Sequence, residues 1–103
     1  MAKVMVNLIE IIDNTSYPMV IKCELNDCKG TKHYFIDKAP VICECEKYTN
    51  ESLCLTPGCT GAIRCNIAEE KEKTYIIDTE FPDHVESLNG DYRFEVWKEQ
   101  IRL

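Results

Sequence analysis

Apolar side chains recur at every second residue in this chain, and this spacing constrains the fold more than any other feature. In segment 19–26 the apolar residues Met19, Ile21, Cys23 and Leu25 alternate with mostly polar ones. Successive side chains of an extended strand point to opposite faces, so such alternation predicts a strand with one buried face. No stretch of a dozen residues carries the 3.6-residue apolar stripe of a helix. The chain is therefore expected to be built from strands.

The first predicted strand is apolar on both of its faces. One face carries Val4, Val6 and Leu8, and the other carries Met5, Ile9 and Ile11. A strand with two apolar faces is usually central in its sheet or covered on both sides.

Turn residues divide the rest of the sequence into further short strands. Segment 19–26 is expected to pair with segment 31–37 through the turn "NDCKG", and segment 62–68 with segment 74–79 through the charged tip "EEKEK". The inward residues of this second hairpin are expected to be Ile63, Cys65, Ile67, Tyr75 and Ile77. Pro40 is expected to open a strand over 41–45, and a closing strand is expected from Tyr92 toward Ile101.

These signals predict an all-β fold in a single domain over residues 1–103. The arrangement is expected to be a small antiparallel β-barrel or sandwich of six to seven short strands, with at most one or two short helical turns.

The charge distribution argues against nucleic acid as a partner. The chain carries a net charge of −6: eight acidic and seven basic residues precede Asn66, against ten and five from Asn66 onward. The C-terminal part, at −5, would repel a phosphate backbone, whereas it would attract a basic protein.

The N-terminal stretch "MAKVMVNLIEIID" is interrupted by Asn7, Glu10 and Asp13 and has no small-residue cleavage site. It therefore predicts neither an export signal nor a membrane span. We expect a cytosolic protein, and in that compartment thiols stay reduced.

Five of the seven cysteines lie in the segment 41–65, which raises the question of a metal site. No Cys-x-x-Cys occurs, but Cys43-x-Cys45 and Cys54-x₄-Cys59 together offer the four thiolates that structural zinc requires. The spacing departs from the usual zinc knuckles, so no cofactor is the first expectation and zinc at Cys43, Cys45, Cys54 and Cys59 is the alternative.

The remaining cysteines point to packing rather than chemistry. Cys23 and Cys65 lie within apolar alternation and are expected in the core. An odd number of cysteines argues against a complete disulfide framework. Cys28, beside Lys29 in a turn, comes closest to an activated thiol. With His33 it could form a smaller site, but His33 lies in an alternating strand and is expected to be a half-buried polar residue instead.

Catalytic motifs are absent from the sequence. There are two histidines, and neither His33 nor His84 lies in a recognisable nucleophile motif. The segment "EFPDHVE" groups Glu80, Asp83, His84 and Glu86, but an ordinary solvated loop explains this grouping better. We therefore expect a protein that is not an enzyme.

The sequence resembles a group of uncharacterised small bacterial proteins of about this length. The shared pattern runs Glu-Leu-x-Asp, a turn glycine, His-x-Phe, then Asp-Lys-x-Pro-Val, and the matching positions are Glu24, Leu25, Asp27, Gly30, His33, Phe35, Asp37, Lys38, Pro40 and Val41. The similarity continues in "PGCTGAIRC" and "IIDTEFPDHVESLNGDYRFEV" and so spans most of the chain. It implies one intact domain and no established activity, and the cysteines at 28, 43, 45, 54 and 59 depart from the pattern.

Three functional hypotheses follow. The first is a non-catalytic, cytosolic protein-binding module that uses its acidic side or an exposed sheet edge, and small acidic immunity proteins are its nearest analogy. The second is a zinc-stabilised structural or regulatory module, and the third is a thiol-dependent redox protein. Nucleic acid and membrane partners are not expected, and homo-oligomerisation stays open.

Overall fold

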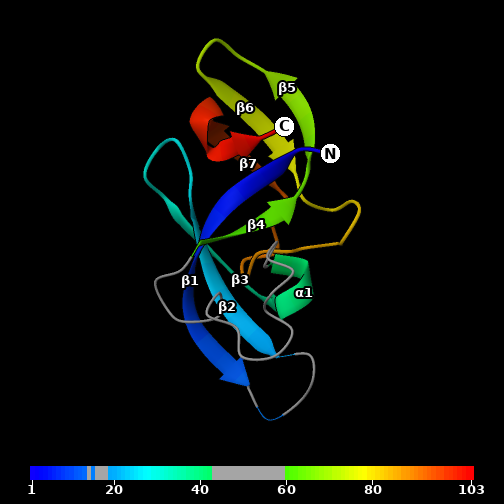
Figure 1. Cartoon of the computed structure of the whole chain (residues 1–103). Coiled ribbons are helices and arrows are strands. Elements are labelled where there is room, and N and C mark those ends of the chain that lie inside the picture. Colours follow the sequence, from blue (N-terminus) through cyan, green and yellow to red (C-terminus); the bar gives the residue numbers. More distant parts are fainter. Residues whose placement is uncertain (14, 16–18, 43–59) are drawn as a thin grey trace.

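The structure, a computed structural model, describes residues 1–13, 15, 19–42 and 60–103 (Figure 1). Eight strands and two short helical turns occur in these ranges. In chain order they are β1 (Lys3–Asp13), β2 (Val20–Asn26), β3 (Lys32–Lys38), α1 (Ala39–Ile42), β4 (Thr60–Arg64), β5 (Asn66–Glu70), β6 (Thr74–Asp78), β7 (Arg93–Trp97), the 3₁₀ turn η3 (Lys98–Gln100) and β8 (Ile101–Arg102).

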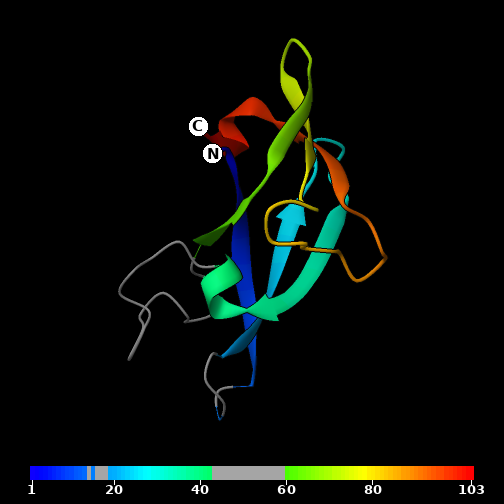
Figure 2. The same cartoon turned by 90° about the vertical axis from the view of Figure 1, so that its right-hand side faces the viewer.

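The strands form two antiparallel sheets. The first has the order β3-β2-β1-β4, with β8 also paired to β1, and the second has the order β5-β6-β7. Lys3 pairs with Arg64 of β4 and with Arg102 of β8, so β1 has a neighbour on each side at this end. The first strand is thus central, as its two apolar faces predict. Its pairing with β8 also brings the two chain ends together (Figures 1 and 2).

The chain passes from one sheet to the other at Cys65. The N–H of Cys65 still donates to the carbonyl of Ala2 (2.9 Å), whereas Asn66 already pairs with Asp78 of β6. Strands β4 and β5 thus follow each other directly but lie in different sheets. The buried side chains of both sheets form one hydrophobic core. The core side chains are Val4, Val6, Leu8, Ile21, Cys23, Leu25, Phe35, Ala39, Ile42, Ile63, Cys65, Ile77, Val85, Phe94 and Val96.

The all-β prediction and the two short helical turns are confirmed. The described sheets do not close on each other, so the barrel, one of the two predicted arrangements, is not confirmed. The hairpin over 19–26 and 31–37 forms as β2 and β3 in the expected alternation. The strand expected over 62–68 is divided between β4 and β5, and its residue Ile67 is exposed rather than inward, because the chain changes sheets just before it.

Two strand predictions are wrong in detail. Residues 39–42 form the helical turn α1 instead of opening a strand at Pro40, since proline is tolerated in the first turn of a helix and the turn buries Ala39 and Ile42. The closing strand stops at Trp97, where the backbone N–H donates to the Gln100 side chain (2.8 Å) and the 3₁₀ turn begins. The chain then resumes as β8.

The turn α1 packs closely against β4. A Cβ atom at Gly61 would lie 2.7 Å from the carbonyl oxygen of Ile42, so only glycine fits at this position of β4. None of the helices in the described ranges is long and apolar enough to cross a lipid bilayer.

Candidate functional site

Residues 79–92 connect β6 to β7. Among the residues that the structure describes, they are the longest segment without a helix or strand. It carries four acidic residues and neither lysine nor arginine, and we call it the acidic loop. Loops of this length inside small domains are uncommon and are usually functional. Its attachment to the sheets therefore decides what it can present.

A buried threonine, Thr79, joins the two ends of the acidic loop. Thr79 is fully buried; its N–H donates to the Tyr92 carbonyl (2.9 Å), and its hydroxyl lies 2.6 Å from the Val85 carbonyl oxygen. The N–H of Val85 donates back to the Thr79 carbonyl (3.0 Å), and the Val85 side chain is in the core. The loop thus begins and ends at one hydrogen-bonded point.

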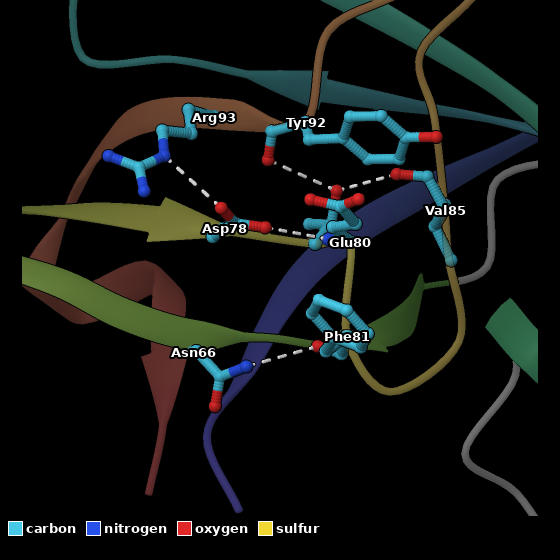
Figure 3. Close-up of polar contacts among 8 residues, drawn as sticks. Asn66, Asp78, Glu80, Phe81, Val85, Tyr92 and Arg93 are labelled. Atoms are coloured by element: carbon cyan, nitrogen blue, oxygen red, sulfur yellow. Dashed lines mark hydrogen bonds and ion pairs between the residues drawn. The ribbon is translucent and has the colours of Figure 1, made fainter.

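Polar side chains of the sheets hold the first half of the loop. Asp78 accepts a hydrogen bond from the Glu80 N–H (2.8 Å) and from Arg93 Nε (3.1 Å), which ties the loop entrance to β7 (Figure 3). The Asn66 amide donates to the carbonyl oxygen of Phe81 (3.3 Å), also drawn in Figure 3. These contacts fix the backbone on both sides of Glu80.

An ion pair anchors the middle of the loop. Arg64 at the end of β4 holds Asp83 with two hydrogen bonds, one of them Nε to Oδ2 at 2.9 Å. The hydrogen bond and the charge of Asp83 raise the pKa of Arg64. This side-by-side geometry fixes direction as well as distance.

The second half of the loop closes one edge of the first sheet. Ser87 and Asp91 are joined by a hydrogen bond from the Ser87 N–H to the Asp91 carbonyl (2.9 Å), and Gly90 supplies the positive φ of 86° that this turn requires. The N–H of Leu88 donates to the carbonyl of Tyr34 in β3 (2.8 Å). The loop is therefore attached to β3, β4, β5 and β7.

His84 indicates how firmly the loop is held. It is a non-glycine residue with a positive φ of 56°, and its Nε2 lies 2.9 Å from the Tyr92 hydroxyl. The left-handed conformation costs roughly 1–2 kcal/mol for an ordinary residue, and it persists only where surrounding contacts impose it.

Apolar side chains nevertheless point outward from this well-anchored loop. Phe81 is 63% exposed and Leu88 is 56% exposed. Single exposed apolar residues are common on protein surfaces. Here the backbone of each is fixed by a hydrogen bond, to Asn66 and to Tyr34, so both side chains are presented from a rigid framework rather than from a flexible tip.

The charge of the loop is largely uncompensated. Asp83 is paired with Arg64, whereas the carboxylates of Glu80 and Glu86 accept no hydrogen bond from any described residue. Both lie close enough to Tyr92 to add to the effect of burial in raising the pKa of its hydroxyl. A negative potential therefore surrounds the exposed side chains.

Glu80, Asp83, His84 and Glu86, for which the sequence predicts an ordinary solvated loop, are not arranged as a metal cluster. Asp83 is engaged by Arg64 and His84 by Tyr92. Within the described ranges no three His, Cys, Asp or Glu side chains are placed to hold a metal ion. The zinc ligands predicted at Cys43, Cys45, Cys54 and Cys59 lie outside the described residues.

The described cysteines are poorly suited to thiolate chemistry. Cys23 and Cys65 are fully buried core residues, as predicted, and burial raises the pKa of Cys65 to about 11. Burial, together with the charges of Glu95 and Asp27, raises the pKa of Cys28, so the adjacent Lys29 does not activate it. A thiolate is the reactive form, which argues against a redox role for these three residues.

His33 is engaged by an acid rather than by Cys28. Its Nε2 lies 2.9 Å from Asp27 Oδ2, and its ring packs edge-on against Phe94 with ring centroids 4.8 Å apart. The backbone N–H of Cys28 instead donates to the Glu95 carbonyl in β7 (2.9 Å). The turn between β2 and β3 thus serves to join the two sheets.

Comparison with known proteins found no matching protein-family model, curated protein or solved structure. The resemblance to uncharacterised bacterial proteins stays a prediction.

Sequence reasoning missed the anchoring of the acidic loop. Thr79, Asn66 and Arg64 have no local signal, because their partners are 6 to 19 residues away in the chain. The absence of lysine and arginine over 79–92 was visible in the sequence and could have singled out the segment.

Proposed function

We propose that this chain is a non-catalytic, cytosolic protein-binding module whose acidic loop recognises a basic surface of a partner protein. The observation that carries the proposal is the combination of exposed Phe81 and Leu88 with uncompensated carboxylates on a rigid loop. Inhibitor-like or immunity-like blocking of the partner is one form that such recognition takes.

Rigidity favours binding because a preorganised loop loses little conformational entropy when a partner docks. Exposed aromatic and large apolar side chains supply the anchors that dominate interface energies. Carboxylates around them contribute mainly to partner choice and to the association rate. The partner is accordingly expected to present basic residues around an apolar pocket.

The test is quantitative capture of a partner from host extract, compared between the wild-type chain and a loop variant. The variant carries Phe81→Ser and Leu88→Ser. The matched control carries Ile12→Ser and Ile36→Ser, which remove two exposed apolar side chains on β1 and β3. Thermal melting of all three proteins checks that the fold is unchanged.

We expect one stoichiometric partner that the wild type and the control retain and the loop variant loses. Its capture should weaken between about 0.05 and 0.5 M salt, because exposed charges are screened within about 10 Å at 0.1 M. Equal recovery by the loop variant and the control would contradict the proposal.

A zinc-stabilised module remains the second candidate, supported by the spacing Cys43-x-Cys45 and Cys54-x₄-Cys59 in the sequence. Structural zinc is bound stoichiometrically and stabilises the fold directly. Elemental analysis of protein purified without chelator is the test: about one zinc per chain supports this function, and less than about 0.2 ends it.

A further inference from the structure

Strand β5 is the outer strand of the second sheet. It pairs with β6 on one side, and no described strand pairs with its other side. All five of its residues are exposed. The β5–β6 hairpin also projects beyond the rest of the molecule in both views (Figures 1 and 2), so another chain can reach this edge.

Two of the other edge strands, β3 and β7, already receive hydrogen bonds from other parts of the chain. On β3 the carbonyl of Tyr34 accepts the N–H of Leu88, and on β7 the carbonyl of Glu95 accepts the N–H of Cys28. Loops or turns of this chain thus supply hydrogen bonds along those two edges. At β5 nothing comparable is present among the residues that the structure describes.

The ladder fixes which backbone groups β5 offers. Lys71 N–H donates to the Thr74 carbonyl (2.9 Å), so Lys71 and Thr74 form a hydrogen-bonded pair of the antiparallel ladder. Hydrogen-bonded and non-hydrogen-bonded pairs alternate, so the next pair, Glu70 opposite Tyr75, is a non-hydrogen-bonded one. The N–H and C=O of Glu70 therefore point away from β6. They are the donor and acceptor that an added strand would use.

Charge makes a second copy of this chain a poor occupant. Strand β5 ends in Glu69 and Glu70. Glu70 is paired with Lys98 (2.8 Å), whereas Glu69 has no partner among the described residues, and pairing of two copies about this end would bring their Glu69 carboxylates close together. A bulge between Ile67 and Glu69 interrupts the ladder and restricts regular pairing with any added strand to the hairpin end of β5. The side chains of a basic segment would instead face the Glu69 carboxylate, which no described residue neutralises.

An apolar anchor lies at the other end of β5. Asn66, its first residue, donates to the carbonyl of Phe81, the most exposed aromatic residue on the acidic loop. A strand added to β5 would thus run between the acidic end of the hairpin and Phe81. The edge and the acidic loop form a continuous route for one extended segment.

We propose that an extended, basic segment of the partner protein adds to β5 as a further strand, using the outward N–H and C=O of Glu70. This inference rests on the proposed function and specifies how the partner binds.

The test uses a capped synthetic peptide of alternating lysine and valine, titrated into the full chain and followed by amide NMR. The critical variant is Glu70→Pro, which removes the outward N–H but no bond of the β5–β6 ladder, since proline is tolerated on edge strands. The matched control is Glu70→Ala, which removes the side chain and its Lys98 ion pair but keeps the N–H.

We expect Glu70→Pro to weaken peptide affinity about tenfold or more, and Glu70→Ala to change it by less than about threefold. In the wild type, the peptide should slow hydrogen exchange of the Glu70 amide. This measurement tests strand addition without any variant. Equal affinity of both variants, an unprotected Glu70 amide, or no binding of the peptide would overturn strand addition.

Two further outcomes would overturn the choice of occupant. Equally tight binding of a glutamate–valine peptide would remove the charge argument. Wild-type self-association that Glu70→Pro abolishes, measured by sedimentation, would assign the edge to a second copy. If peptide binding persists in Glu70→Pro but is lost with Phe81→Ser and Leu88→Ser, the proposed function stands and strand addition falls.

Discussion

Two connections in this protein carry carboxylates, but the carboxylates have opposite roles in the two. In the turn between β2 and β3, the Asp27 carboxylate accepts hydrogen bonds from the N–H groups of Lys29 and Thr31 and lies 2.9 Å from His33 Nε2. In the acidic loop, Glu80 and Glu86 accept none from any described residue. A satisfied carboxylate stabilises the fold, whereas an unsatisfied one on a rigid frame is available to a partner.

The largest expected effect is on the turn. Asp27→Ala leaves two backbone N–H groups and His33 without their acceptor, and hydrogen bonds to a charged group contribute about 1.5–3 kcal/mol. We therefore expect the free energy of unfolding, measured by urea titration, to fall by about 2 kcal/mol. Asp91→Ala, at an exposed residue of the acidic loop, is the control and should change it by less than about 0.5 kcal/mol. Equal losses would mean that the two connections do not differ.

The next effect concerns Thr79, which joins the two ends of the acidic loop. Thr79→Val keeps the shape of a buried residue but leaves the Val85 carbonyl without its donor, which costs about 1–3 kcal/mol. Hydrogen exchange at the Val85 amide should accelerate, because that amide donates to the Thr79 carbonyl. Thr79→Ser retains the hydroxyl and should preserve the slow exchange. If valine and serine behave alike, this hydrogen bond does not hold the loop.

A smaller effect should appear on acidification. Burial alone would raise the pKa of Asp27, but the hydrogen bond from His33 and those from the Thr31 and Lys29 N–H groups outweigh it and lower the pKa below its ordinary value of 3.8. The stability that this provides is complete above pH 3.8 and is lost as pH falls through the lower pKa of the folded state. Asp27→Asn should flatten the loss of stability below about pH 4. An unchanged slope would exclude Asp27 as its source.

The smallest expected effect is that of Arg64→Gln. The Arg64 side chain is 51% exposed, and isolated surface ion pairs contribute little to stability. The melting temperature should be nearly unchanged at any salt concentration. Asp83, left without its charge partner, should instead add to the negative potential of the loop and accelerate association of the lysine–valine peptide at low salt. A large drop in melting temperature would show that this pair stabilises the fold.

The strands were predictable because their signal is local. Ile21, Cys23 and Leu25 alternate within one strand, and each is buried as that alternation requires. Helical turn α1 was not predictable in the same way, since its burial depends on β4, which follows it by many residues in the chain. Ile67 continues the alternation of β4 in sequence, but it belongs to another sheet and is exposed.

By itself the sequence determined that this protein is built from strands, which residues of β2 turn inward, and that its negative charge is concentrated from Asn66 onward. These properties depend on side-chain spacing and composition, which neighbouring residues decide. Only the tertiary structure decided that the chain changes sheets at Cys65, that Thr79 and Arg64 hold the acidic loop, and that no described strand pairs with the outer side of β5. Each of those depends on hydrogen bonds between distant segments, and such bonds form only where the packed core brings the segments together.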